Sequence, residues 1–160
     1  MSAPSLSFTA DDQAKGCGLA LIDCPVEQDR AYWEWHIDET ASQQGSLIMF
    51  GVSNKRNQKF YEILGESSIP AEKHGTKFLA GVEGLKEGDV VGVAVQQSQV
   101  PMIRIFVNGE ESSASVSKFR GSCFPAVYLP DAGVTFLYRE DQLRSRPAGW
   151  DPLIAERSLV

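Results

Sequence analysis

Short runs of apolar residues recur along the chain and are separated by residues that favour turns. Runs of this kind with turn signals between them are typical of antiparallel β-structure. No segment shows ten residues of convincing helical periodicity, and the best helical candidates are residues 81–86 and 153–157. We expect strands at residues 18–23, 31–38, 45–53, 89–96, 102–107, 122–129 and 133–140.

The clearest expected strand is residues 31–38, where apolar and polar side chains alternate with a period of two. That period is what a strand with one buried face requires. Its apolar face carries Trp33, Trp35 and Ile37. Its polar face carries Glu34, His36 and Asp38. We therefore predict that both tryptophans lie in the core and that the polar face is exposed to solvent.

The residues between the expected strands predict specific turns. Asn108-Gly109 follows the strand at 102–107 and predicts a tight turn, because both residue types tolerate positive φ. Residues 130–133, Pro-Asp-Ala-Gly, predict a four-residue loop between the last two strands. Gly51 and Gly92 interrupt apolar strands, which indicates either a close contact between sheets or a bend. The pattern as a whole predicts a sandwich of antiparallel sheets.

Length and charge limit the classes of function. The 160 residues suit one domain with a core of its own, and 42% of them are hydrophobic. The formal charge of −6 argues against general nucleic-acid binding, which needs a basic face. No apolar run reaches the roughly 20 residues of a membrane span, and the first ten residues do not resemble a secretory signal. We expect no membrane association and a cytoplasmic location, with the nucleus as the alternative.

Candidate catalytic and metal-binding residues are sparse. Cys17, Cys24 and Cys123 are an odd number and have no zinc spacing, so we expect reduced thiols. His36 and His74 lack an identifiable nucleophile beside them in the sequence. No phosphate-binding glycine loop precedes a helix, and no calcium loop is present. We predict no enzymatic activity, no catalytic residue, no metal site and no cofactor.

Two segments do not read as regular strands. Residues 54–77 begin with a cationic run at 54–59, which is either a solvated loop or a small patch suited to an acidic or phosphorylated peptide. After Glu140 the chain contains Pro147 and Pro152, which exclude a regular element. We expect this tail to pack on the sandwich through Trp150, against the alternative of a disordered terminus.

An ordered set of motifs resembles the SPRY domain family, and in particular its small proteins that consist of a single SPRY domain. The resemblance extends over about residues 16–140. The tail motif Arg-Pro-Ala-Gly-Trp at 146–150 resembles that of the small members. The motifs of the domain are Tyr32-Trp33-Glu34, Phe50-Gly51-Val52-Ser53, the segment from Gly88 to Gly92, the segment from Ile105 to Gly109, Phe119-Arg120-Gly121, the segment from Phe124 to Val127, and the strand at 134–138.

The resemblance implies a bent sandwich of two antiparallel sheets that is not an enzyme. It divides the chain into an extension at 1–15, a domain at 16–140 and a packed tail at 141–160. It also implies recognition of another protein, as a peptide or loop, through loops at one end of the sandwich. Carried onto this sequence, the partner-binding residues are Pro25, Ser53, Asn54, Lys55, Arg56, Tyr61, Pro130 and Asp131.

One alternative function remains open from the residues. A carbohydrate-binding, lectin-like sandwich would share the layered architecture. Such a site needs an exposed aromatic platform beside convergent carboxylates or amides. Tyr61 and Trp150 are the plausible exposed aromatic residues for that role.

Overall fold

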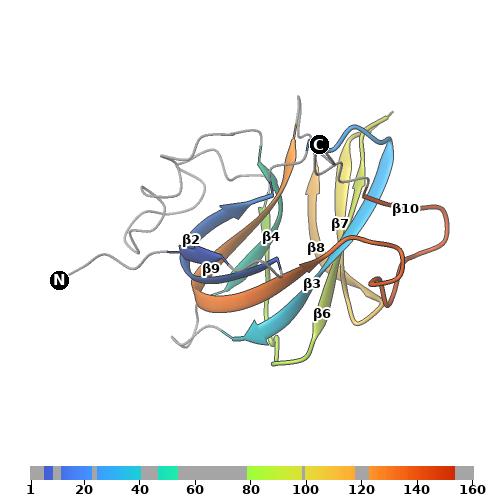
Figure 1. Ribbon diagram of the computed structural model, residues 1–160. Coiled ribbons are helices and arrows are strands. Elements are labelled where there is room, and N and C mark those ends of the chain that lie inside the picture. Colours follow the sequence, from blue (N-terminus) through green and yellow to red (C-terminus); the bar gives the residue numbers. More distant parts are fainter. Residues whose placement is uncertain are drawn as a thin grey trace.

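The computed structural model describes residues 6–8, 12–22, 25–40, 47–53, 79–98, 100–117 and 123–153. These residues fold into strands and connections, with no helix among them (Figure 1). The strands are β1 (Leu6–Phe8), β2 (Gln13–Leu21), β3 (Arg30–Glu39), β4 (Ile48–Ser53), β5 (Leu79–Val82), β6 (Val90–Gln96), β7 (Met102–Val107), β8 (Glu110–Ser117), β9 (Phe124–Leu137) and β10 (Asp151–Pro152). The prediction of an all-β fold is confirmed.

The strands form a strongly curved antiparallel sheet with the order β1-β2-β9-β3-β6-β7-β8, in which β4 pairs with both β9 and β5. The long strand β9 connects the two layers. Its first half pairs with β4, where Phe124 lies opposite Ser53, and its second half pairs with β3, where Leu137 lies opposite Glu34. Figure 1 shows β9 curving between these two partners. Only β10, among the described strands, pairs in parallel, and its partner is β3.

The predicted loop at 130–133 is wrong, because β9 runs through it without a break. Gly16 of β2 lies opposite Ala132 and Cys17 lies opposite Pro130, so Asp131 is an extra residue in a β-bulge. Asp131 has a φ of 59°, which is the left-handed conformation that aspartate tolerates better than most residues. The turn-forming residues therefore bend a strand here instead of ending it.

Other predicted elements differ in detail. The tight turn at Asn108-Gly109 is present, with φ values of 51° and 89°, but the strand that follows it, β8, was not predicted. The helical candidate at 81–86 is wrong, because Gly81 belongs to β5 and the residues after Val82 form bends and turns. The second helical candidate, at 153–157, lies outside the described residues except for Leu153.

The prediction that the apolar face of β3 lies in the core is confirmed. Trp33, Trp35 and Ile37 have no exposed surface. Trp35 packs against Phe136 of β9, with 4.9 Å between the ring centroids. Burying large aromatic side chains is the main source of stability for a domain of this size.

The outward face of β3 contradicts the prediction at one residue. His36 and Asp38 are half-buried, but Glu34 has no exposed surface. The cover comes from residues 138–153, which leave β9, cross the outward face and return as β10 (Figure 1). We call these residues the C-terminal strap. Trp150 of the strap is 8% exposed.

Gly92 has a different role from the predicted contact between sheets. It lies opposite Glu34 on the outward face, and a Cβ atom there would stand 2.1 Å from the Tyr32 hydroxyl oxygen. The missing side chain therefore makes room for Tyr32 beneath the strap.

Candidate functional site

Two of the predicted partner-binding residues are at the same end of the sandwich. Ser53 ends β4 opposite Phe124, the first residue of β9. The loop between β2 and β3 reaches the same place, because the Val26 amide donates to the Cys123 carbonyl at 2.8 Å. Pro25 is exposed in that loop, whereas Ser53 is fully buried. Ser53 thus marks where β4 reaches this end, and of the two residues Pro25 is the one that is accessible to a partner.

The loop at residues 25–29 is fixed by Gln97, which follows β6. The Gln97 side-chain amide donates to the carbonyls of Val26 and Gln28, at 2.8 and 2.7 Å. Its backbone amide donates to the Asp29 carbonyl at 2.8 Å. These bonds join the β2–β3 loop to the β6–β7 loop and hold both in one conformation.

Asp29 adds a further link between the two loops. The backbone amide of Ser98 donates to Asp29 Oδ1 at 2.7 Å. Hydrogen bonding from Ser98 holds the pKa of the Asp29 carboxyl below its ordinary value. Val100, in the β6–β7 loop, is 63% exposed and is the most exposed large apolar residue of the described chain. We call residues 25–29, 97–98 and 100–101 the end surface.

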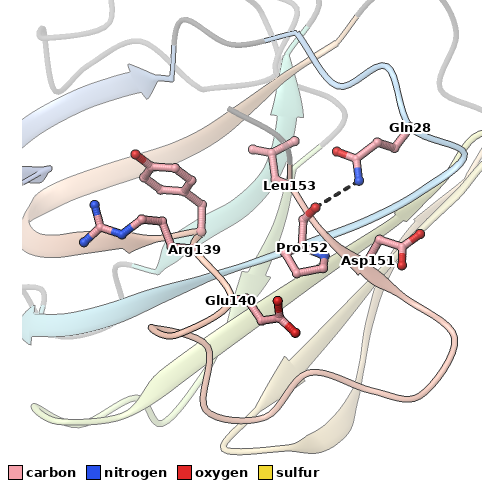
Figure 2. Close-up of a pocket in the computed structure, with 7 residues that line it drawn as sticks. Gln28, Arg139, Glu140, Asp151, Pro152 and Leu153 are labelled. Carbon is pink, nitrogen blue, oxygen red and sulfur yellow. Dashed lines mark hydrogen bonds between the residues drawn. The ribbon is translucent and has the colours of Figure 1, made fainter. Parts of the chain in front are cut away.

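A shallow groove of about 660 Å³ lies beside the end surface and shares Gln28 with it. Gln28 Nε2 donates to the Pro152 carbonyl at 2.9 Å, which ties the loop to β10 (Figure 2). Figure 2 shows Arg139 and Glu140 on one side of the groove and Asp151 on the other. The remaining lining residues are Tyr138, Pro152 and Leu153.

Sequence analysis missed this groove. Its residues come from three short segments that are far apart in the chain, and β10 brings them together. The Pro-rich tail with its Trp150 anchor was the available signal, because it predicted that the tail would return to the sandwich.

Two more of the predicted residues are at a different place in the fold. Pro130 and Asp131 are at the β-bulge, beside Cys17 of β2, and not at the end where β9 begins. Asp131 is exposed and Pro130 is half-buried. Asn54, Lys55, Arg56 and Tyr61 lie outside the described residues. The structure therefore brings Pro25 and Ser53 to one end and separates them from Pro130 and Asp131.

His36 and Asp38 form a polar cluster on the outward face of β3. His36 Nδ1 lies 2.7 Å from Asp38 Oδ1, and Asp38 also accepts hydrogen bonds from Gln13 and Thr135. Burial alone would raise the pKa of Asp38, but the three hydrogen bonds together lower it below its ordinary value. The carboxylate is thus fully engaged in joining β3 to β2 and β9.

The described cysteines are poor nucleophiles. Cys17 and Cys123 are buried free thiols, and Cys24 lies outside the described residues. Burial raises the pKa of the Cys123 thiol to about 12, so little thiolate forms at neutral pH. Within the described ranges, no group of three or more His, Cys, Asp or Glu residues could hold a metal ion. The same residues include no helix that could cross a membrane.

An antiparallel β-sandwich with fixed loops at one end is an architecture that commonly serves binding. Two sets of known proteins resemble it. SPRY domain-containing protein 7 from Gallus gallus and from Homo sapiens are each 21% identical to this chain over 151 residues. Those matches cover 90% of this chain and 74% of each relative. No protein-family model matches the chain.

Solved structures show the same fold. The SPRY domain of human HERC1 aligns with a TM-score of 0.59 and 13% identity, over 87% of this chain and 94% of that one. The neuralized-NHR1 domain of Drosophila melanogaster aligns with a TM-score of 0.64 and 14% identity, over 84% of this chain and 92% of that one. The chain has the fold of a SPRY domain, and its predicted resemblance to a small single-SPRY protein is confirmed. SPRY domains are typically protein-interaction modules and generally non-catalytic.

Proposed function

We propose that this SPRY domain binds a peptide or loop of a partner protein at the end surface. The observation that carries the proposal is the bracing of residues 25–29 by Gln97. A loop that is already held in one conformation loses little entropy on binding, so more of the contact energy appears as affinity. Pro25, Glu27 and Asp29 project from this braced loop as exposed residues.

The chemistry of the end surface suits a mixed contact. Val100 offers an exposed apolar side chain, and the neighbouring groove offers the apolar walls of Tyr138 and Leu153. An apolar centre with a polar rim is the usual anatomy of a protein–protein interface. In this proposal Lys55 and Arg56 would add positive charge for an acidic partner segment, with Tyr61 as an aromatic contact.

Pro130 and Asp131 form a separate part of the proposal. They are at the bulge of β9, so a partner that touches both them and Pro25 must extend along the sandwich. The carbohydrate-binding alternative has lost support at Trp150, because that ring is buried against Tyr32, Ala94 and Phe106 instead of forming an exposed platform.

The test is quantitative affinity capture from lysate with mass spectrometry, followed by direct binding measurements with the captured protein. Val100→Glu and Arg56→Glu should each weaken the partner's affinity by about 1–3 kcal/mol while leaving the melting temperature unchanged. Asp131→Ala tests the bulge by itself. Lys86→Glu is the control, because Lys86 is exposed near the other end of β3, where Gly88 bonds to Ile37.

The outcomes separate the parts of the proposal. Loss of the partner with Val100→Glu but not with Lys86→Glu supports the end surface. Equal affinity for the wild type, Val100→Glu and Arg56→Glu would move the binding site elsewhere. A loss with Asp131→Ala alone would place it at the bulge.

A further inference from the structure

A buried carboxylate under the strap requires an explanation. Glu34 has no exposed surface, and it lies on the face of β3 that points away from the main core. Burying a carboxylate is costly unless hydrogen bonds or an opposite charge compensate for the lost water. The partners of Glu34 therefore determine whether this part of the fold is stable.

The strap supplies two of the three donors to Glu34. The backbone amide of Arg144 donates to Oε1 at 2.8 Å, and that of Ser145 donates to Oε2 at 2.9 Å. The third donor is the Tyr32 hydroxyl, at 2.8 Å from Oε2. Two consecutive backbone amides thus converge on one carboxylate, and such charge-assisted bonds are stronger than neutral ones.

A second anchor holds the strap close to its other end. The Trp150 ring packs in a small cluster with Tyr32, Ala94 and Phe106, and Leu143 of the strap packs against the same cluster. The Arg30 guanidinium lies 5.5 Å from the centroid of the Trp150 ring. This second anchor is mainly apolar. It shares Tyr32 with the first anchor, because the Tyr32 hydroxyl lies 2.8 Å from Glu34 Oε2 and 3.3 Å from the Ser145 carbonyl oxygen.

Between the two anchors the strap is mostly in solvent. Arg146, Ala148 and Gly149 are exposed. The backbone bonds near its ends are local, from Leu143 to Arg139 and from Trp150 to Pro147. The sheet beneath has its own ladder between β3, β6 and β7, and the strap joins β3 at its C-terminal end, where β10 pairs with β3 and the Leu153 amide donates to the Tyr32 carbonyl. Segments with few buried contacts of this kind open more easily than the sheet they cover.

We propose that the Glu34 carboxylate is the latch of the C-terminal strap. Its two oxygens hold the Arg144 and Ser145 amides and keep the outward face of β3 and β6 covered. When the carboxylate is lost, the middle of the strap opens as a unit and the sheet stays folded. Opening of the middle gives water access to Glu34 and to the Tyr32 hydroxyl, whereas Ala94 and Phe106 stay packed against Trp150.

The direct test is residue-resolved amide hydrogen exchange on the full chain, comparing wild type with Glu34→Gln. Glutamine keeps the shape of the side chain, but its amide nitrogen cannot accept the bonds now made to Oε2. Exchange at Arg144 and Ser145 should accelerate by about tenfold to a hundredfold. Amides of the ladder between β3 and β6, such as those of Trp33 and Val93, should exchange at their wild-type rates.

Asp38→Asn is the matched control. Asp38 is a carboxylate two residues further along the same face, and its bonds go to Gln13, His36 and Thr135 instead of the strap. This variant should leave exchange at Arg144 and Ser145 unchanged. Trypsin adds an independent readout, because opening should expose the bond after Arg144 to cleavage in Glu34→Gln but not in Asp38→Asn.

Two results would overturn the proposal. One is unchanged exchange at Arg144 and Ser145 in Glu34→Gln. The other is equal acceleration in the strap and in the sheet, which would make Glu34 a general stabilising residue. If Glu34→Gln does not fold, hydrogen exchange of the wild type at increasing denaturant concentration still tests whether the strap opens separately from the sheet. The strap amides should then exchange through a local opening whose free energy depends only weakly on denaturant. Exchange of these amides only through global unfolding would contradict the proposal.

Discussion

The two faces of β3 follow the same alternation of side chains, but they differ in what buries them. Trp33, Trp35 and Ile37 face inward and are buried by the opposite layer of the sandwich. On the outward face, Asp38 stays partly open to water while Glu34 is sealed. The difference arises from the strap, which covers one half of the outward face and leaves the other half uncovered.

The comparison shows what a period of two can establish. It tells which side chains share a face, because successive residues of a strand point in opposite directions. It does not tell what covers each face, because the covering segment can come from anywhere in the chain. At Glu34 the cover comes from Arg144 and Ser145, more than a hundred residues away.

The largest expected effect is on the inward face. Trp33→Ala should lower the free energy of unfolding by about 3–5 kcal/mol, because it leaves a large cavity in the core. Urea denaturation followed by circular dichroism measures the change. Val100→Ala, at an exposed position, should stay within about 0.5 kcal/mol of the wild type. A loss of less than about 1 kcal/mol in Trp33→Ala would mean that the inward face tolerates voids.

A smaller effect is expected where the outward face is covered. Gly92→Ala places a Cβ atom within 2.1 Å of the Tyr32 hydroxyl oxygen, so Tyr32 must move away from Glu34. Overpacking of this kind costs about 1–3 kcal/mol. Combining it with Tyr32→Phe should recover part of that loss, because the closest clashing atom is gone. If the two changes simply add in a double-mutant cycle, the clash is absent.

The smallest effect is expected where the outward face is open to water, and it depends on pH. The pKa of Asp38 is lowered in the folded state, so its contribution to stability is present above the ordinary value of 3.8. That contribution disappears as the pH falls through the lower, folded-state pKa. Asp38→Asn should therefore be less stable than wild type at pH 7, and the gap should narrow below pH 3.8.

Denaturation curves at neutral and acidic pH measure this gap. A gap that is constant with pH would mean that the carboxylate makes no charge-dependent contribution. Glu87→Gln, at an exposed position in the turn before β6, serves as the control for nonspecific charge effects.

In the candidate site too, features that depend on neighbouring residues could be predicted from the sequence, whereas contacts between distant segments could not. Pro25 was predicted at the end of the sandwich because the SPRY resemblance implies a binding loop before the strand with the Tyr-Trp-Glu motif. The bracing of its loop by Gln97 was not predicted, because Gln97 is remote in sequence and becomes a neighbour only through the pairing of β3 with β6. Pro130 and Asp131 were predicted to form a loop because the Pro-Asp pair is typical of turns. The same residue types also occur at a β-bulge, so the pair alone does not distinguish the two.

By itself the sequence determined the all-β fold, the inward face of β3 and the SPRY resemblance, because strand periodicity and turn residues act over a few neighbouring positions. Only the tertiary structure decided that β9 continues through Asp131 and that Gln28 meets Pro152 beside the groove. It also decided that Glu34 is buried. These features depend on segments that are distant in the chain, and their pairing is fixed when the whole sheet curves and the strap closes over it.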